Sequence, residues 1–130
     1  MDEITKILVP FDGTIHSQKA LESAIYFARK LNSQISLLHV RFSTTISESQ
    51  NSEMIDLMEA SKIKAAQNGI DLNYEIINGK VEKSILDYAK KWKYRLIIMG
   101  SYGAGTTDAF YSSVSNSILQ NSPIPVLIVK

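Results

Sequence analysis

Short apolar runs alternate with longer amphipathic stretches along this chain. The runs typical of strands cover residues 4–9, 35–40, 72–77, 96–99 and 126–129. Between them, apolar residues recur at helical spacing near 17–31, 52–67, 81–92 and 113–120. This βαβαβαβαβ alternation is typical of parallel strands joined by right-handed crossovers, so it predicts an α/β domain with an open, doubly wound sheet.

The five strands differ in how their apolar residues are arranged. In the third strand, Leu72, Tyr74 and Ile76 alternate with polar residues, which predicts one solvated face and a place at the edge of the sheet. The first and fourth strands are continuously apolar at residues 7–9 and 96–98, which predicts burial on both faces. We therefore expect the first and fourth strands in the middle of the sheet.

Length and composition narrow the class of protein. The chain has 130 residues, which suits one domain, and its 14 basic and 13 acidic residues give a formal charge of +1. A nearly neutral chain does not favour nucleic acid or an anionic membrane as a partner. The absence of cysteine excludes disulfides, thiolate metal sites and cysteine nucleophiles. Because no apolar run is long enough for a membrane span or a signal peptide, we expect one cytoplasmic domain over residues 1–130.

The fourth strand runs directly into a Gly-x-x-Gly turn from Gly100 to Gly103. Glycines let a backbone approach a ligand closely, and the helix start predicted at Ser112-Ser113 would offer N–H groups to an anion. The arrangement therefore predicts a phosphate cradle. Residues 101–122 contain no Lys or Arg, so backbone N–H groups, hydroxyls or a metal would have to hold the phosphates. A loop that merely connects strand to helix is the alternative interpretation.

This turn, together with Ser112-Ser113, resembles the nucleotide signature of the universal stress protein family. In that signature, Gly-x-x-Gly is followed after a short spacer by Gly and then Ser or Thr. Here the spacer of eight residues, 104–111, is one residue shorter, and Ser112 stands at the third glycine. Pro10-Phe11-Asp12 and the strand that ends at Val40 are similar to the family's first loop and second strand. The resemblance covers essentially the whole chain.

For the fold, the resemblance implies an adenine nucleotide alpha hydrolase-like sheet of five parallel strands in the order 3-2-1-4-5. That order reverses direction between strands one and four, and open α/β sheets bind ligands at such a point. For function, it implies a stress-response module that binds an adenine nucleotide, ATP or AMP, with Mg²⁺ or Mn²⁺ brought by the phosphates. Two alternatives stay open: a universal stress protein that acts through its dimer surface without a nucleotide, and a slow ATP hydrolase.

The resemblance also implies roles for single residues. Asp12 would anchor the ribose or a metal-linked phosphate, and Val40 would contact adenine. The full set of expected nucleotide contacts is Pro10, Phe11, Asp12, Val40, Met99, Gly100, Tyr102, Gly103, Ser112, Ser113 and Val114. Within it, the glycines would cradle the phosphates, while Ser113 and Val114 would supply helix-start N–H groups.

Other roles for these residues stay open. Asp12 could be a turn residue that bonds its own backbone, and Val40 could belong to the core. Tyr102 could stack on a base or sugar, or could be an exposed loop residue. No residue is predicted to be catalytic, and we interpret His16 and His39 as structural because no cluster of metal ligands accompanies them.

The last strand, Val126–Val129, is continuously apolar although the implied order places it at a sheet edge. Exposed edges are normally protected by charges or kept short. Pairing with the same strand of a second copy would cover this edge, and related family members similarly dimerise through this strand. We therefore expect a homodimer.

Overall fold

The computed structural model describes residues 3–42, 47–101 and 108–130, with the backbone alone described for 108–113. The strands are β1 (Lys6–Pro10), β2 (Gln34–Arg41), β3 (Leu72–Asn78), β4 (Ile97–Gly100) and β5 (Val126–Val129). The helices are α1 (Ile15–Leu31), α2 (Glu48–Gln67), α3 (Val81–Lys91) and α4 (Asp108–Asn121). Their alternation confirms the α/β class predicted from the apolar pattern.

The strands form one parallel sheet in the order β3-β2-β1-β4-β5, as expected. The central strand β1 pairs with β2 on one side and with β4 on the other. Ile7, Leu8 and Val9 have no exposed surface, as a strand buried on both faces requires. At the β3 edge, by contrast, Asn73 and Glu75 are exposed, which confirms the alternation seen in the sequence.

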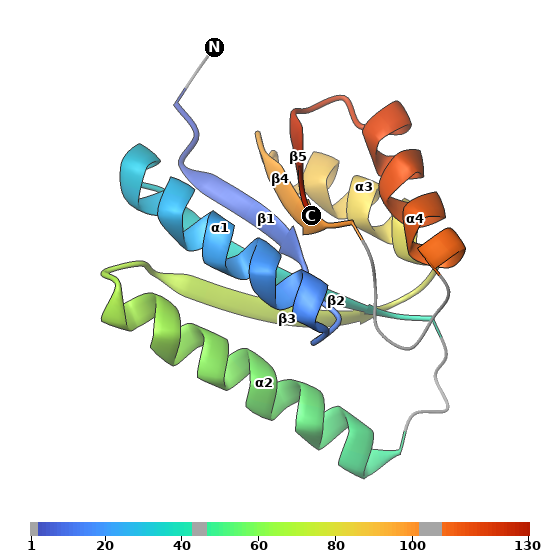
Figure 1. Ribbon diagram of the computed structural model, residues 1–130, viewed down its shortest axis with the longest axis horizontal. Coiled ribbons are helices and arrows are strands. Elements are labelled where there is room, and N and C mark those ends of the chain that lie inside the picture. Colours follow the sequence, from blue (N-terminus) through green and yellow to red (C-terminus); the bar gives the residue numbers. More distant parts are fainter. Residues whose placement is uncertain (1–2, 43–46, 102–107) are drawn as a thin grey trace.

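Helices cover both faces of the sheet (Figure 1). Small residues of α1, such as Ala20, Ala24 and Ala28, let that helix pack closely over the strands in one apolar cluster, which α2 joins through Met58. On the opposite face, α3 and α4 pack in a second cluster. None of the helices described is both long enough and apolar enough to cross a membrane.

Helix α2 begins four residues before the position that periodicity predicts, at Glu48 and not at Ser52. The reason is a capping box. The Ser47 side chain accepts a hydrogen bond from the Gln50 N–H, and the Gln50 side chain accepts one from the Ser47 N–H, both at 3.2 Å. Capping residues thus extend the helix beyond its apolar stripe.

Helix α4 also begins earlier than expected, at Asp108 and not at Ser113. An acidic residue suits the positive end of a helix, whereas the serine pair that we predicted as the helix start lies inside the helix. Since only the first four N–H groups of a helix lack a partner within it, those of Ser113 and Val114 are not available. Their assignment as helix-start N–H groups was wrong.

The buried centre of the sheet makes a specific prediction about stability. Ile98 of β4 is fully buried, so Ile98→Ala should lower the free energy of unfolding by about 2–5 kcal/mol. The same substitution at Ile63, whose side chain is 60% exposed on α2, should change it by about 0.5 kcal/mol or less. Urea unfolding of both variants gives the two values, and equal losses would contradict this assignment of the core.

Candidate functional site

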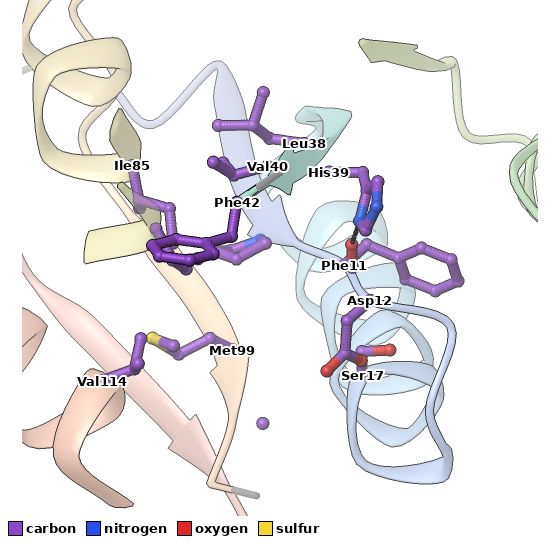
Figure 2. Close-up of a pocket in the computed structure, with 13 residues that line it drawn as sticks. Phe11, Asp12, Ser17, Leu38, His39, Val40, Phe42, Ile85, Met99 and Val114 are labelled. Atoms are coloured by element: carbon purple, nitrogen blue, oxygen red, sulfur yellow. Dashed lines mark hydrogen bonds between the residues drawn. The ribbon is translucent and has the colours of Figure 1, made fainter. Parts of the chain in front are cut away.

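A cavity of about 390 Å³ lies at the carboxyl ends of β1, β2 and β4, where the strand order reverses (Figure 2). Its walls are Pro10, Phe11, Asp12, Ser17, Leu38, His39, Val40, Phe42, Val81, Ile85, Met99, Gly100 and Val114. The expected residues that meet here are Pro10, Phe11, Asp12, Val40, Met99, Gly100 and Val114. Of the others, Tyr102 and Gly103 lie outside the described residues, and the side chains of Ser112 and Ser113 are not among those described.

Sequence reasoning missed one whole wall of this cavity. Val81 and Ile85 come from α3, and Phe42 directly follows β2. In Figure 2, Ile85 and Phe42 gather with Val40 on one side of the cavity, and Met99 lies across from them. Phe42 is 81% exposed, which is unusual for so large an apolar side chain. An aromatic residue just beyond a strand's carboxyl end was the signal that could have identified it.

The loop after β1 is fixed to β2 by two short hydrogen bonds. The Phe11 N–H donates to the Leu38 carbonyl at 2.8 Å, and Nδ1 of His39 lies 2.8 Å from the Phe11 carbonyl oxygen (Figure 2). Because a carbonyl oxygen can only accept, the proton must be on Nδ1. Burial lowers the pKa of His39 below its ordinary value of 6.5. His39 therefore acts here as a neutral side chain that positions the loop.

Asp12 has a structural role that the sequence had left open. Its Oδ1 accepts a hydrogen bond from the Thr14 N–H at 3.0 Å, which closes the turn into α1. Thr14 then caps the helix, because its hydroxyl accepts from the Ser17 N–H at 3.2 Å. Asp12 remains part of the cavity wall, so its carboxylate can still face a ligand.

Gly100 brings the end of β4 against the first turn of α1. A Cβ at this position would lie 2.6 Å from the backbone oxygen of His16, so no other residue fits without a shift. The glycine is thus required for packing, whether or not it also approaches a phosphate. Next to it, the buried hydroxyl of Ser101 has no hydrogen-bond partner among the described residues. A buried hydroxyl without a partner is uncommon, and it could donate to a ligand oxygen.

The cavity has little charge to offer. Among its described wall residues, Asp12 is acidic, and none is Lys or Arg. No group of three or more His, Asp or Glu residues that could hold a metal occurs in the described part of the chain. A single carboxylate, already engaged in a turn, does not make a resident metal site. These residues therefore suit an apolar ring with a polar end better than a multiply charged anion.

Comparison with known proteins identifies the family of this chain. The model of the universal stress protein family matches residues 3–130, and the chain belongs to that family. Universal stress protein YxiE of Bacillus subtilis is 32% identical over 145 residues, which cover 96% of this chain and 98% of YxiE.

Solved structures share the same fold. Universal stress protein UspA from Lactobacillus plantarum superposes with a TM-score of 0.89 and 21% identity over 100% of both chains. The universal stress protein from Archaeoglobus fulgidus, solved in complex with dAMP, has a TM-score of 0.78 and 15% identity over 99% of this chain and 100% of its own. At these identities the likeness establishes the fold, and the nucleotide is a property of the Archaeoglobus protein.

The half-buried, neutral His39 predicts a pH dependence. In the unfolded chain this imidazole binds a proton near pH 6.5, whereas the folded protein resists protonation because its pKa is lowered. Stability should therefore fall as the pH drops through 6.5 toward the lower folded pKa. Urea unfolding at about pH 7.5 and pH 5.5 should show a smaller difference for His39→Gln than for the wild type. His16→Gln is the control: it keeps His39 and should therefore keep the part of the stability difference that His39 causes. If the difference in His39→Gln equals that of the wild type, the assignment to His39 is contradicted.

Proposed function

We propose that this protein is an adenine-nucleotide-binding module of the stress response, and that the cavity between β1, β2 and β4 is its nucleotide site. One observation carries the proposal: in a chain of this family, a cavity opens at the point where the strand order reverses. Open α/β sheets bind ligands at such points. The volume, about 390 Å³, is within the usual range for a small-molecule site.

The walls suit a flat, weakly polar ring. Val40, Ile85 and Met99 present aliphatic surface or sulfur to the space between them, and Phe42 closes one side. Burying the faces of an adenine against such groups is favourable because it removes apolar surface from water. Adenine therefore belongs between α3 and the ends of β2 and β4.

The polar end of the ligand would lie toward α1 and the end of β4. Asp12 can accept a hydrogen bond from a ribose hydroxyl, and the Ser101 hydroxyl beside Gly100 has no partner within the described part of the chain. No basic residue occurs in the described walls or anywhere in residues 101–122. Each added phosphate thus brings negative charge toward Asp12 without a cation to balance it, so we propose AMP as a better ligand than ATP.

Hydrolysis is the weaker candidate activity. Phosphoryl transfer needs stabilisation of the charge that develops on the phosphate oxygens. The described wall residues contain no cation for that purpose, and the Asp12 carboxylate is occupied in part by the turn into α1. The site is better suited to holding a nucleotide than to cleaving one.

Titration calorimetry tests the site. AMP should bind, and ATP without Mg²⁺ should bind about fivefold more weakly, equivalent to about 1 kcal/mol of charge repulsion. Val40→Trp fills the cavity with a larger side chain. Because forcing extra volume into a packed space costs about 1–3 kcal/mol, this variant should bind AMP about tenfold more weakly or worse.

The matched control is Ile76→Trp. Ile76 is also a half-buried strand residue, but it packs in the cluster on the α1 and α2 face, away from the cavity. This variant should bind AMP as the wild type does. No heat with AMP or ATP at millimolar concentration would reject the nucleotide proposal, and equal binding by both tryptophan variants would reject its location.

We also propose that the protein is a homodimer that pairs β5 strands. At one side β5 pairs with β4, and its other side is the sheet edge. The two edges differ in chemistry: β3 presents Asn73 and Glu75, whereas every residue of β5 is apolar and half-buried in the single chain. A second copy would satisfy the unpaired backbone groups and cover those side chains.

Light scattering at micromolar concentration should give a mass near twice that of the 14.5 kDa chain. Leu127→Lys should reduce the mass toward that of one chain, because a charge would be placed in the paired edge. Ile63→Lys, at an exposed position of α2, is the control and should leave the mass unchanged. A wild-type mass of one chain would defeat the dimer proposal.

A further inference from the structure

A short segment between α3 and β4 concentrates positive charge that the chain as a whole does not show. Within residues 90–95 lie Lys90, Lys91, Lys93 and Arg95, with Trp92 and Tyr94 between them. Removing these four from the 14 basic residues leaves ten against 13 acidic ones, so the rest of the chain has a formal charge of −3. All four cations are exposed. The near-neutral total therefore hides a basic segment interleaved with aromatic rings.

Those rings line a second cavity of about 290 Å³. Tyr88 and Tyr94 are stacked, with ring centroids 5.9 Å apart, and Trp92 lies 6.4 Å from Tyr88. Tyr94 is buried, so it fixes the position of the cluster, whereas Trp92 remains 48% exposed. The result is a firmly supported aromatic wall with one large ring facing solvent.

The opposite wall is polar. Because Asn73 and Glu75 lie on an exposed face of the edge strand β3, they complete the cavity with an amide and a carboxylate. The Glu75 carboxylate accepts a hydrogen bond from the Tyr88 hydroxyl at 3.4 Å. Carboxylates and amides are the groups that accept from and donate to the edges of nucleobases.

Two lysine ammonium groups lie over the rings of this cluster. Lys6 Nζ is 4.5 Å from the centroid of Tyr94, and Lys91 Nζ is 5.1 Å from that of Trp92. A planar base stacked on the aromatic wall would therefore have its backbone phosphate close to fixed positive charge. Stacking rings next to cations are the two components of sites for single-stranded nucleic acid.

The backbone at Lys93 makes this residue useful for separating the effect of charge from that of stability. Lys93 has a φ of 58°, in the left-handed region where glycine is preferred after a helix. A lysine at this position is strained, and nothing in the packing requires its side chain, which is exposed. The conformation has a local cause, because it closes the end of α3, where the Tyr94 N–H donates a hydrogen bond to the Ala89 carbonyl at 2.9 Å.

We propose that this cavity and the basic segment 90–95 bind single-stranded nucleic acid, with one base on Trp92 and the phosphates along the lysines. The site lies at the amino ends of β1 and β4, near Lys6 and Arg95, whereas the nucleotide cavity lies at their carboxyl ends. It is therefore independent of the proposed AMP site. An anionic membrane is the less suitable occupant, because lipid headgroups offer no planar ring to stack on the aromatic wall.

Trp92 is the only tryptophan of the chain, so its fluorescence reports on this site alone. Titration with a ten-nucleotide single strand at low salt should quench it. Neutralising about two to four phosphates should give a slope of log K against log salt of about −1.5 to −3. RNA and DNA versions of one sequence show whether the sugar matters, and either one binding supports the site.

Three variants, measured by anisotropy of a labelled strand, separate stacking from charge. Trp92→Ala should weaken binding roughly fivefold or more through loss of stacking. Lys93→Gly should also weaken binding although it relieves backbone strain and should raise the urea midpoint, a combination that a merely structural role would not give. Lys30→Gln is the matched control, because Lys30 lies over the exposed ring of Tyr26 at 5.5 Å on α1, and it should bind as the wild type does.

The nucleic-acid proposal and the AMP proposal can be tested independently of each other. Val40→Trp fills the nucleotide cavity and should leave binding of the strand unchanged. The inference is overturned if neither the RNA nor the DNA strand quenches the Trp92 fluorescence at about 1 mM and low salt. It is also overturned if Trp92→Ala binds the strand with wild-type affinity, because binding would then rest on charge attraction without stacking. Quenching by phosphatidylserine vesicles but not by oligonucleotide would overturn it in favour of a membrane.

Discussion

The contact on which the candidate site most depends is the one between Gly100 and the first turn of α1. Because a Cβ at Gly100 would lie 2.6 Å from the His16 backbone oxygen, the end of β4 can approach α1 only with glycine at this position. This approach sets the separation of β4 from the loop after β1. The same loop is held to β2 through Phe11 and His39. The ends of β1, β2 and β4 are thereby fixed around one cavity, mainly by contacts between backbone atoms.

The chemistry of that cavity follows from how its polar groups are used. Asp12 and Thr14 serve the turn and the cap that begin α1, and His39 is neutral because it is buried. What remains toward the ligand is mostly aliphatic surface. Beside the wall residue Gly100, the buried Ser101 hydroxyl has no partner among the residues that the structure describes. A site of this kind gains affinity by burying a ring, and it gains little from attraction to phosphates. This balance is the physical reason for proposing a nucleotide of low charge.

The two ends of the sheet have opposite character. At the carboxyl ends, helices α3 and α4 converge over the strands and leave an apolar cavity. At the amino ends, the polar side of β3 lies beside the aromatic residues that follow α3, which leaves a cavity with rings, a carboxylate and nearby ammonium groups. The net charge of the chain does not reveal this separation, because acidic residues elsewhere cancel the positive charge of residues 90–95.

The sequence alone determined the order of elements, the central burial of residues 7–9 and the β3 edge of the sheet, because apolar periodicity reports directly how many faces of a strand are buried. The β5 edge followed only from the strand order that the family resemblance implied, since that strand is continuously apolar. The sequence also indicated part of the cavity, since the carboxyl ends of parallel strands must meet at one side of the sheet. It could not show that Val81 and Ile85 form a wall, or that Lys6 lies over a ring 88 positions later in the chain, at Tyr94. Nor did it locate the start of α4, which lies at Asp108 and not at the predicted Ser113. Periodicity records whether a side chain is buried, whereas the identity of its neighbours depends on how the crossover helices pack, and only the tertiary structure decides that.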